Sequence, residues 1–324
     1  MTNDKPEVYN KELVEKLSPG TLILSIHNGG SFWGEEERAR RLSDIIVDKV
    51  KHAEELGIGE CKILRLVVVT GDYVGEITEW NKQLDEAWRA PSEGAIAQTL
   101  TWGDGQPLTT YSVIILHQAI ALGLVESEDE TKATSEGTLI HELAHVHDNI
   151  RHLSKIGPQP VPKQGDWISY RQFIARSIWG EFFSEMVAYP YVKDHYLDEY
   201  IDHGINMLHN AISDVKQEML AFQSHRDAHE VWAVAVDKLS AVFNQLGRCL
   251  GLLVSAQRMD DNNNQIDQFA HGIGEISKDW EQVVRQLIKK LANIEREFEE
   301  EKFNNLGEVV DQGFRTVDLE PYDK

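Results

Sequence analysis

The chain is poor in cysteine and in basic side chains. Only 2 of its 324 residues are cysteines, and Cys61 and Cys249 lie far apart without a CxxC spacing. This excludes a disulfide framework and a cysteine-based zinc site. Lys and Arg total 32 against 54 Asp and Glu, a formal net charge of −22. Such a field repels phosphate backbones, so we expect no nucleic-acid partner.

Long apolar runs are also missing. No uninterrupted apolar segment approaches the roughly 20 residues that a membrane-spanning helix needs. The first residues lack the basic segment followed by an apolar stretch that a secretory signal requires. We therefore expect a cytoplasmic protein without a membrane partner. Its hydrophobic content of 41% is enough for a packed core.

The first third of the chain alternates apolar segments with a charged helical pattern. Strands are expected at residues 21–26, 62–70, 95–102 and 111–117, and an amphipathic helix at 35–56. From Glu128 to about Phe303 the periodicity is helical. Breaks are expected at residues 157–160, Ser224, residues 260–264 and Gly272. The predicted fold class is α+β, with a mixed α/β N-terminal part that holds a small sheet and a mainly helical C-terminal part.

Residues 138–146 (TLIHELAHV) hold two histidines four positions apart. On a helix, His141 and His145 then share one face and can reach a single ion. Neutral imidazoles suit zinc, and the adjacent Glu142 can take a proton from an attacking water molecule. The apolar flanks indicate a buried helix. The alternative is an amphipathic helix whose histidines belong to the core.

This segment resembles the extended HExxH signature of the zincin metallopeptidases, although His147 stands where that family has an apolar residue. The metzincin continuation is excluded, because Asp148 and Arg151 replace its Gly and His. The resemblance is therefore to the gluzincin branch. It implies a zinc cofactor, His141 and His145 as ligands, and Glu142 as the catalytic base.

In the gluzincin branch a later helix supplies the third ligand as Glu, followed one turn on by an acidic residue. Glu181 and Glu185 fit this order, and they share a helical stripe with apolar residues. The resemblance implies Glu181 as the ligand and Glu185 as the acceptor for the ring N–H of His141. Two alternatives stay open: Glu185 is the ligand, or both carboxylates face water. Residues 181–190 also resemble the corresponding segment of the ImmA/IrrE-type metallopeptidases.

Other polar residues near the motif have two interpretations each. Asp148 extends the metal face of the motif helix as an outer acceptor, or it is a hydrated residue in the last turn. Tyr170, Tyr189 and His195 are candidate donors to a tetrahedral oxyanion, or they serve packing.

Together these observations predict a zincin-like catalytic domain over residues 1–196, made of an α/β portion (1–127) and active-site helices (128–196). Residues 197–324 form a helical region. The predicted function is a zinc-dependent hydrolase, a peptidase that acts on a peptide or protein substrate. Two alternatives are a catalytically silent binding or regulatory protein with structural zinc, and a hydrolase of a small non-peptide amide. The sequence leaves the oligomeric state open.

Overall fold

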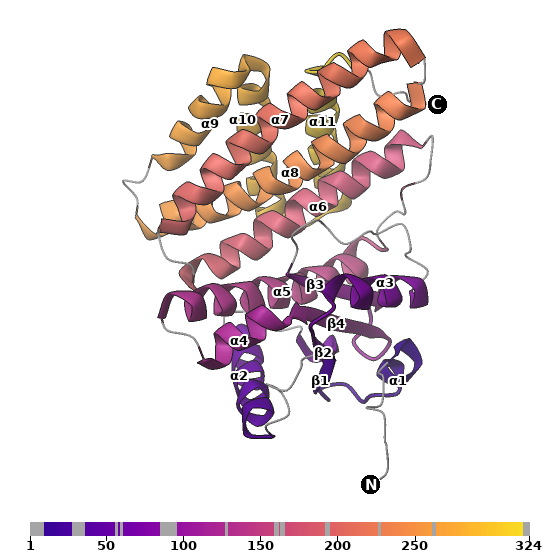
Figure 1. The fold of residues 1–324 in the computed structure, drawn as a ribbon, viewed down its shortest axis with the longest axis vertical. Coiled ribbons are helices and arrows are strands. Elements are labelled where there is room, and N and C mark those ends of the chain that lie inside the picture. The colour runs from indigo at the N-terminus through magenta and orange to yellow at the C-terminus, as the bar shows by residue number, and fades with distance from the viewer. Residues whose placement is uncertain are drawn as a thin grey trace. The chain divides into compact units, whose positions relative to one another are not determined.

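The computed structural model describes residues 10–27, 36–55, 58, 61–84, 96–126, 129–158, 162, 166–191, 195–225, 228–260 and 264–319. The chain divides into two compact units, residues 1–157 and 158–324. Figure 1 shows the strands in the first unit and an all-helical second unit. This confirms the predicted α+β class.

The first unit contains one mixed sheet and several helices. Its elements are α1 (Lys11–Glu15), β1 (Ile23–His27), α2 (Glu36–Glu55), the short 3-10 helix η2 (Cys61–Ile63), β2 (Leu64–Thr70), α3 (Tyr73–Gln83), β3 (Ala97–Gly103), β4 (Thr110–His117), α4 (Gln118–Glu126) and α5 (Asp129–Lys155). The strand order is β1-β2-β4-β3. β1, β2 and β4 run parallel, and β3 pairs antiparallel with β4. All residues of β2 are buried, as expected of a central parallel strand.

Alternating strand residues pack on two helical layers. Leu66, Val68 and Ile115 point to one face, where they form a core with residues of α1 and α3. Because side chains alternate along a strand, Val67 and Ile114 point to the opposite face. That face is covered by α4 and α5, which contact the sheet there. The motif helix α5 therefore lies against the sheet and packs most closely on β3.

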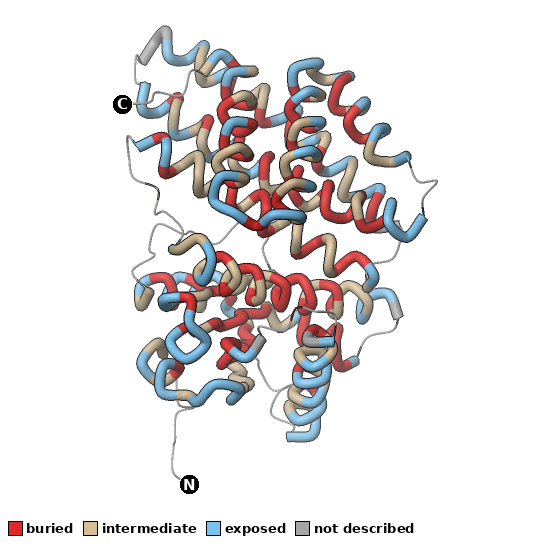
Figure 2. The backbone as a smooth tube through the Cα atoms, turned by 180° about the vertical axis from the view of Figure 1, so that it is seen from behind, coloured by how far each residue is buried: buried red, intermediate tan, exposed pale blue. Residues whose placement is uncertain are grey.

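The second unit is built around one long apolar helix. Its elements are α6 (Trp167–Ala188), the 3-10 helix η3 (Tyr189–Tyr191), α7 (His195–His225), α8 (Ala228–Met259), α9 (Gln265–Ile276), α10 (Lys278–Arg296) and α11 (Glu300–Arg315). α6 and α7 pack against α8, while α11 packs against both α6 and α10. Buried stretches of these helices face one another and the exposed stretches lie outside (Figure 2).

α8 is the one described helix that is long and apolar enough to cross a membrane. Most of its apolar stretch is buried, as in the core helix of a soluble protein. This burial supports a soluble chain.

Two glycines bring α8 very close to α6. A Cβ atom added at Gly247 would lie 2.6 Å from the carbonyl oxygen of Ile178. One added at Gly251 would lie 2.3 Å from that of Phe182. No side chain fits between the two backbones at these points. The close approach fixes which residues of α6 and α8 meet.

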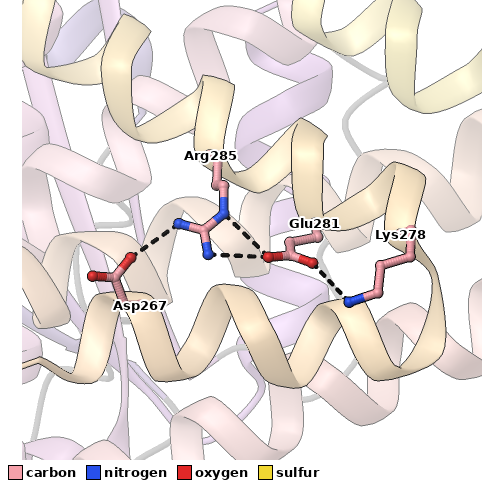
Figure 3. A network of polar contacts seen from close by, with 4 residues as sticks. All are labelled: Asp267, Lys278, Glu281 and Arg285. Atoms are coloured by element: carbon pink, nitrogen blue, oxygen red, sulfur yellow. Dashed lines mark hydrogen bonds and ion pairs between the residues drawn. The ribbon is translucent and has the colours of Figure 1, made fainter.

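The outer surface of the second unit carries an ion-pair network between α9 and α10 (Figure 3). Arg285 contacts Asp267 on α9 at 2.9 Å and Glu281 on its own helix at 3.0 Å, and Lys278 contacts Glu281 at 3.1 Å. Solvent screens exposed ion pairs of this kind, so each contributes little to the free energy of folding. The network adds little to stability compared with the apolar contacts beneath it.

The helix breaks expected at residues 157–160, Ser224 and residues 260–264 are confirmed by the ends of α5, α7 and α8. The break expected at Gly272 is wrong, because α9 continues to Ile276 and the chain breaks at Ser277. A Cβ atom at Gly272 would lie 3.3 Å from Ile205 Cδ1, so this glycine lies where α9 packs closely on α7.

The predicted domain boundary after residue 196 differs from the compact division at residues 157/158. α6 belongs to the second compact unit because it packs mainly on α8 and α11. A functional region need not follow this division, so residues 1–196 as a catalytic domain stay a prediction.

Candidate metal centre

Helix α5 holds His141 and His145 on one face. Their Nε2 atoms lie 3.0 Å apart, and the ring centroids lie 4.6 Å apart. Two imidazole nitrogens bound at about 2.0–2.1 Å to a tetrahedral zinc ion are separated by roughly 3.3 Å. The two rings therefore already stand near the separation that a shared ion requires. His141 is buried and His145 is partly exposed.

Glu142 is buried beside these rings and is held by the sheet. Thr99 on β3 donates its hydroxyl to Glu142 Oε2 at 2.7 Å, and the same hydroxyl lies 3.0 Å from the Glu142 backbone oxygen. Thr99 points to the α5 face of the sheet, as does Thr101, which accepts a hydrogen bond from Asn149 at 3.2 Å. The edge strand therefore fixes both the position of α5 and the orientation of the Glu142 carboxylate.

α5 continues for several turns beyond the motif. Asp148 is 2% exposed, and its charge lies close enough to Arg151 to affect the pKa of the guanidinium. Burial lowers the pKa of Arg151, and the negative charge of Asp148 partly opposes this. The His152 Nδ1–H donates to the Gly157 carbonyl oxygen at 3.0 Å, which closes the end of the helix. His152 therefore has a structural contact, whereas Asp148 is a buried carboxylate on the motif helix.

Helix α6 carries Glu181 and Glu185 one turn apart. The Glu185 residue is 6% exposed and the Glu181 side chain 16% exposed. Arg248 of α8 donates its Nε–H to Glu181 Oε2 at 2.7 Å. This burial argues against the alternative in which both carboxylates face water. The close approach at Gly247 and Gly251 brings the two helices near enough for the ion pair.

Tyr200 of α7 adds a hydroxyl to this acidic cluster. The charge of Glu185 is the main cause that raises the pKa of Tyr200, followed by burial. The charge of Glu181 is the main cause that raises the pKa of Arg248. The guanidinium is therefore positively charged and the phenol protonated over the whole physiological range. The Arg248 side chain as a whole is 38% exposed.

The cluster contains residues that could hold a metal ion. His141, His145 and Glu181 each offer one ligand atom, and these atoms all lie within 4.8 Å of one another. Two imidazole nitrogens with one carboxylate oxygen form the donor set of many catalytic zinc sites, which keep a further position open for water. The residues present therefore fit a zinc ion.

The three candidate oxyanion donors lie on α6, η3 and α7. Tyr189 is 7% exposed in η3, directly after α6. Tyr170 lies in the first turn of α6 and is partly buried. His195 begins α7, and its side chain lies outside the described residues. Their role as oxyanion donors stays a prediction.

Sequence reasoning missed Thr99, Tyr200 and Arg248. Thr99 lies 43 positions before Glu142, and Arg248 lies 67 positions after Glu181. Their segments contain no motif that singles them out, since a threonine in a strand and an arginine in a helix are ordinary. The packing of β3 on α5 and of α8 on α6 makes them neighbours of the predicted residues.

Comparison with known proteins adds no relative. No protein-family model, no curated protein and no solved structure matches this chain significantly. The function is therefore inferred from the chain's own residues.

Proposed function

We propose that the protein is a zinc-dependent hydrolase, most specifically a peptidase of the gluzincin type. His141, His145 and Glu181 would hold the ion, and Glu142 would act as the general base. The observation that carries the proposal is the group of three ligand atoms within 4.8 Å of one another, with a buried glutamate next to the first histidine. A structural zinc site would need a fourth protein ligand, and Glu142 would then have no role.

A bound zinc ion supplies Lewis acidity, which polarises a carbonyl oxygen and makes water a nucleophile near neutral pH. The chain's own residues handle the proton. The Glu142 carboxylate accepts it from the attacking water and passes it to the leaving amine. The Thr99 hydroxyl, donated to Oε2, keeps the carboxylate in one orientation during both transfers.

Arg248 has a supporting role in this proposal. Its Nε–H donates to Glu181 Oε2, and this contact would hold the Glu181 side chain in one rotamer as a ligand. Its guanidinium and the protonated Tyr200 hydroxyl are donors that lie near enough to Glu181 and Glu185 to feel their charges. We infer that one of them assists the developing oxyanion, in place of or beside Tyr170, Tyr189 and His195.

The position of β3 supports a peptide as substrate. In the described sheet β3 is an edge strand, and Thr99 on this strand touches Glu142. An extended peptide can add to such an edge through main-chain hydrogen bonds. A peptide bound there would pass alongside the general base, whereas a small amide would gain nothing from the edge. We further propose a cytoplasmic enzyme with no nucleic-acid partner, in keeping with the net charge of −22.

The test is zinc content by elemental analysis together with peptidase activity on unstructured protein substrates. The parent is compared with Glu142→Gln, Glu181→Ala and Glu185→Ala. We expect one zinc per parent chain, loss of zinc in Glu181→Ala, and retained zinc with activity reduced by about 100-fold or more in Glu142→Gln. A parent without zinc, or full zinc retention in Glu181→Ala, would contradict the ligand set. If the parent binds zinc but is no more active than Glu142→Gln, the catalytically silent alternative would be favoured.

A further inference from the structure

A second group of side chains in the first unit has the geometry of an activated serine. Ser25 Oγ and His27 Nε2 lie 2.8 Å apart, and His27 Nδ1 and Glu76 Oε2 lie 2.9 Å apart. A nucleophile hydrogen-bonded to a base that a third group orients is the diagnostic arrangement of nucleophilic catalysis. We propose that Ser25, His27 and Glu76 form a second, metal-independent centre that accepts acyl groups from small carboxylic esters.

The hydrogen bonds define the protonation states needed for this chemistry. A carboxylate only accepts, so the His27 Nδ1–H must donate to Glu76. The neutral ring then presents the lone pair of Nε2 to the Ser25 hydroxyl, which donates its proton there. Trp80 Nε1–H donates to the other carboxylate oxygen, Glu76 Oε1, at 3.0 Å. The carboxylate is therefore held from both sides, and the imidazole is fixed in one tautomer.

The group lies where parallel sheets place their functional residues. His27 is the last residue of β1, and its register partner Thr70 is the last residue of β2. Glu76 lies on α3, the helix that follows β2. Ligands of open parallel sheets bind at the carboxyl ends of the strands. Ser25 and His27 point to the same face because they are two residues apart on one strand.

Access and oxyanion donors are both compatible with a small ester. Every residue of β1 is partly exposed, and the His27 side chain is 10% exposed. β1 is an edge strand of the described sheet, so alternate amide N–H groups of this strand point away from β2. The Gly71 N–H donates to the His27 carbonyl oxygen, which places His27 on the paired side of the strand. The Ile26 N–H, next to Ser25, then faces the open edge as a donor for an oxyanion.

The proposed reaction is balanced without any cofactor. Ser25 Oγ attacks the ester carbonyl carbon while its proton moves to His27 Nε2. The carbon–oxygen bond to the alcohol breaks, and the alcohol leaves with the proton from His27. Water then attacks the acyl-serine, its proton again moves to His27, and the carboxylic acid and Ser25 are released.

The alternative is that the hydrogen bond between Glu76 and His27 serves only to pair two polar side chains where α3 packs on the sheet. An activated serine differs from such a structural group by its reactivity toward electrophiles, which depends on the histidine. A fluorophosphonate probe measures this reactivity on the full chain without knowledge of the substrate. The variants are Ser25→Ala, which removes one oxygen atom, and His27→Gln and Glu76→Gln, which keep polar side chains. Thermal melting shows that each variant is folded.

We expect one probe molecule per parent chain, located on Ser25 by peptide mass spectrometry, and no labelling of Ser25→Ala. The labelling rate should fall by about 100-fold or more in His27→Gln and by about tenfold or more in Glu76→Gln. Labelling, and the part of p-nitrophenyl acetate hydrolysis that Ser25→Ala abolishes, should persist in the presence of a zinc chelator. A folded parent that takes up no probe would overturn the proposal. So would Ser25 labelling at the same rate in folded His27→Gln.

Discussion

Thr99 and Glu142 are joined by a hydrogen bond of 2.7 Å from the threonine hydroxyl to the carboxylate oxygen Oε2. The bond connects the edge strand β3 with the motif helix α5. Both residues belong to the same compact unit. The Glu142 carboxylate, the general base in the proposed function, is therefore oriented by the sheet.

Replacing Thr99 by Val should slow turnover without loss of zinc. The valine keeps the shape but removes the donor, and a hydrogen bond to a charged group is worth about 1.5–3 kcal/mol. We expect kcat to fall by about tenfold or more, measured with zinc content on the same samples. Thr101→Val is the matched control, because Thr101 lies on the same face of β3 but contacts Asn149 and Ser112. Equal losses in both variants would indicate a general disturbance of the strand.

Replacing Arg248 by Met should weaken zinc binding. Without the Nε–H donor, Glu181 loses the contact that fixes its rotamer. Changes of this kind in groups behind a ligand reduce metal affinity by about 10–100-fold. Competition with a chromophoric chelator measures the affinity. Arg258→Met is the control, since Arg258 also lies on α8 and pairs with the partly exposed carboxylate of Glu295 at 2.6 Å. Unchanged affinity in Arg248→Met would remove Arg248 from the centre.

Gly251→Ala should destabilise the second unit. The added Cβ atom would lie 2.3 Å from the Phe182 carbonyl oxygen, so α6 and α8 must separate. Overpacking of this kind costs about 1–3 kcal/mol, and the midpoint of thermal unfolding should fall by several degrees. Gly272→Ala is the control, because its Cβ atom meets only the flexible end of Ile205 at 3.3 Å. Its cost should be smaller, because the end of Ile205 can move aside whereas the backbone oxygen of Phe182 cannot.

Alkaline pH should destabilise the protein through Cys249. Burial raises the pKa of this fully buried thiol to about 12, whereas an unfolded thiol titrates near pH 8.5. Above about pH 8.5 the unfolded chain releases the proton that the folded chain keeps, so rising pH favours unfolding up to about pH 12. The contribution approaches roughly 1.4 kcal/mol per pH unit. Urea unfolding at several pH values should show a flatter decline for Cys249→Ala, and identical slopes would refute this assignment.

The sequence was sufficient for features that depend on local periodicity. The apolar run of β2 and the four-residue spacing of His141 and His145 are each contained in a few consecutive positions. Contacts between side chains of α5 and β3 depend on residues that are far apart in the sequence. The pairing of Thr99 with Glu142 could not be predicted, because the sequence of a strand does not indicate which helix will cover that strand. The same holds for Glu76 and His27, which are 49 positions apart.

Gly272 illustrates the opposite error. The conformational freedom of glycine predicts a helix break at this position. In the structure its small size is what matters, since it permits α9 to lie close to Ile205 on α7. Gly247 and Gly251 have the same role in α8. In a bundle of long helices, therefore, an isolated glycine can indicate a close contact between two helices as well as the end of a helix.

Because α11 packs on α6, α6 cannot complete its packing until α11 has been synthesised. Trp167 Nε1 and Arg171 Nη1, at the start of α6, bond to Asp311 of α11 at 2.7 and 2.8 Å. α6 also carries Glu181, whereas His141 and His145 belong to the unit that emerges first. A nascent chain would thus expose two histidines long before the helix with the carboxylate gains its last packing partner. In the proposed function, Glu181 would therefore join the two histidines only after the later helices of the second unit have been made.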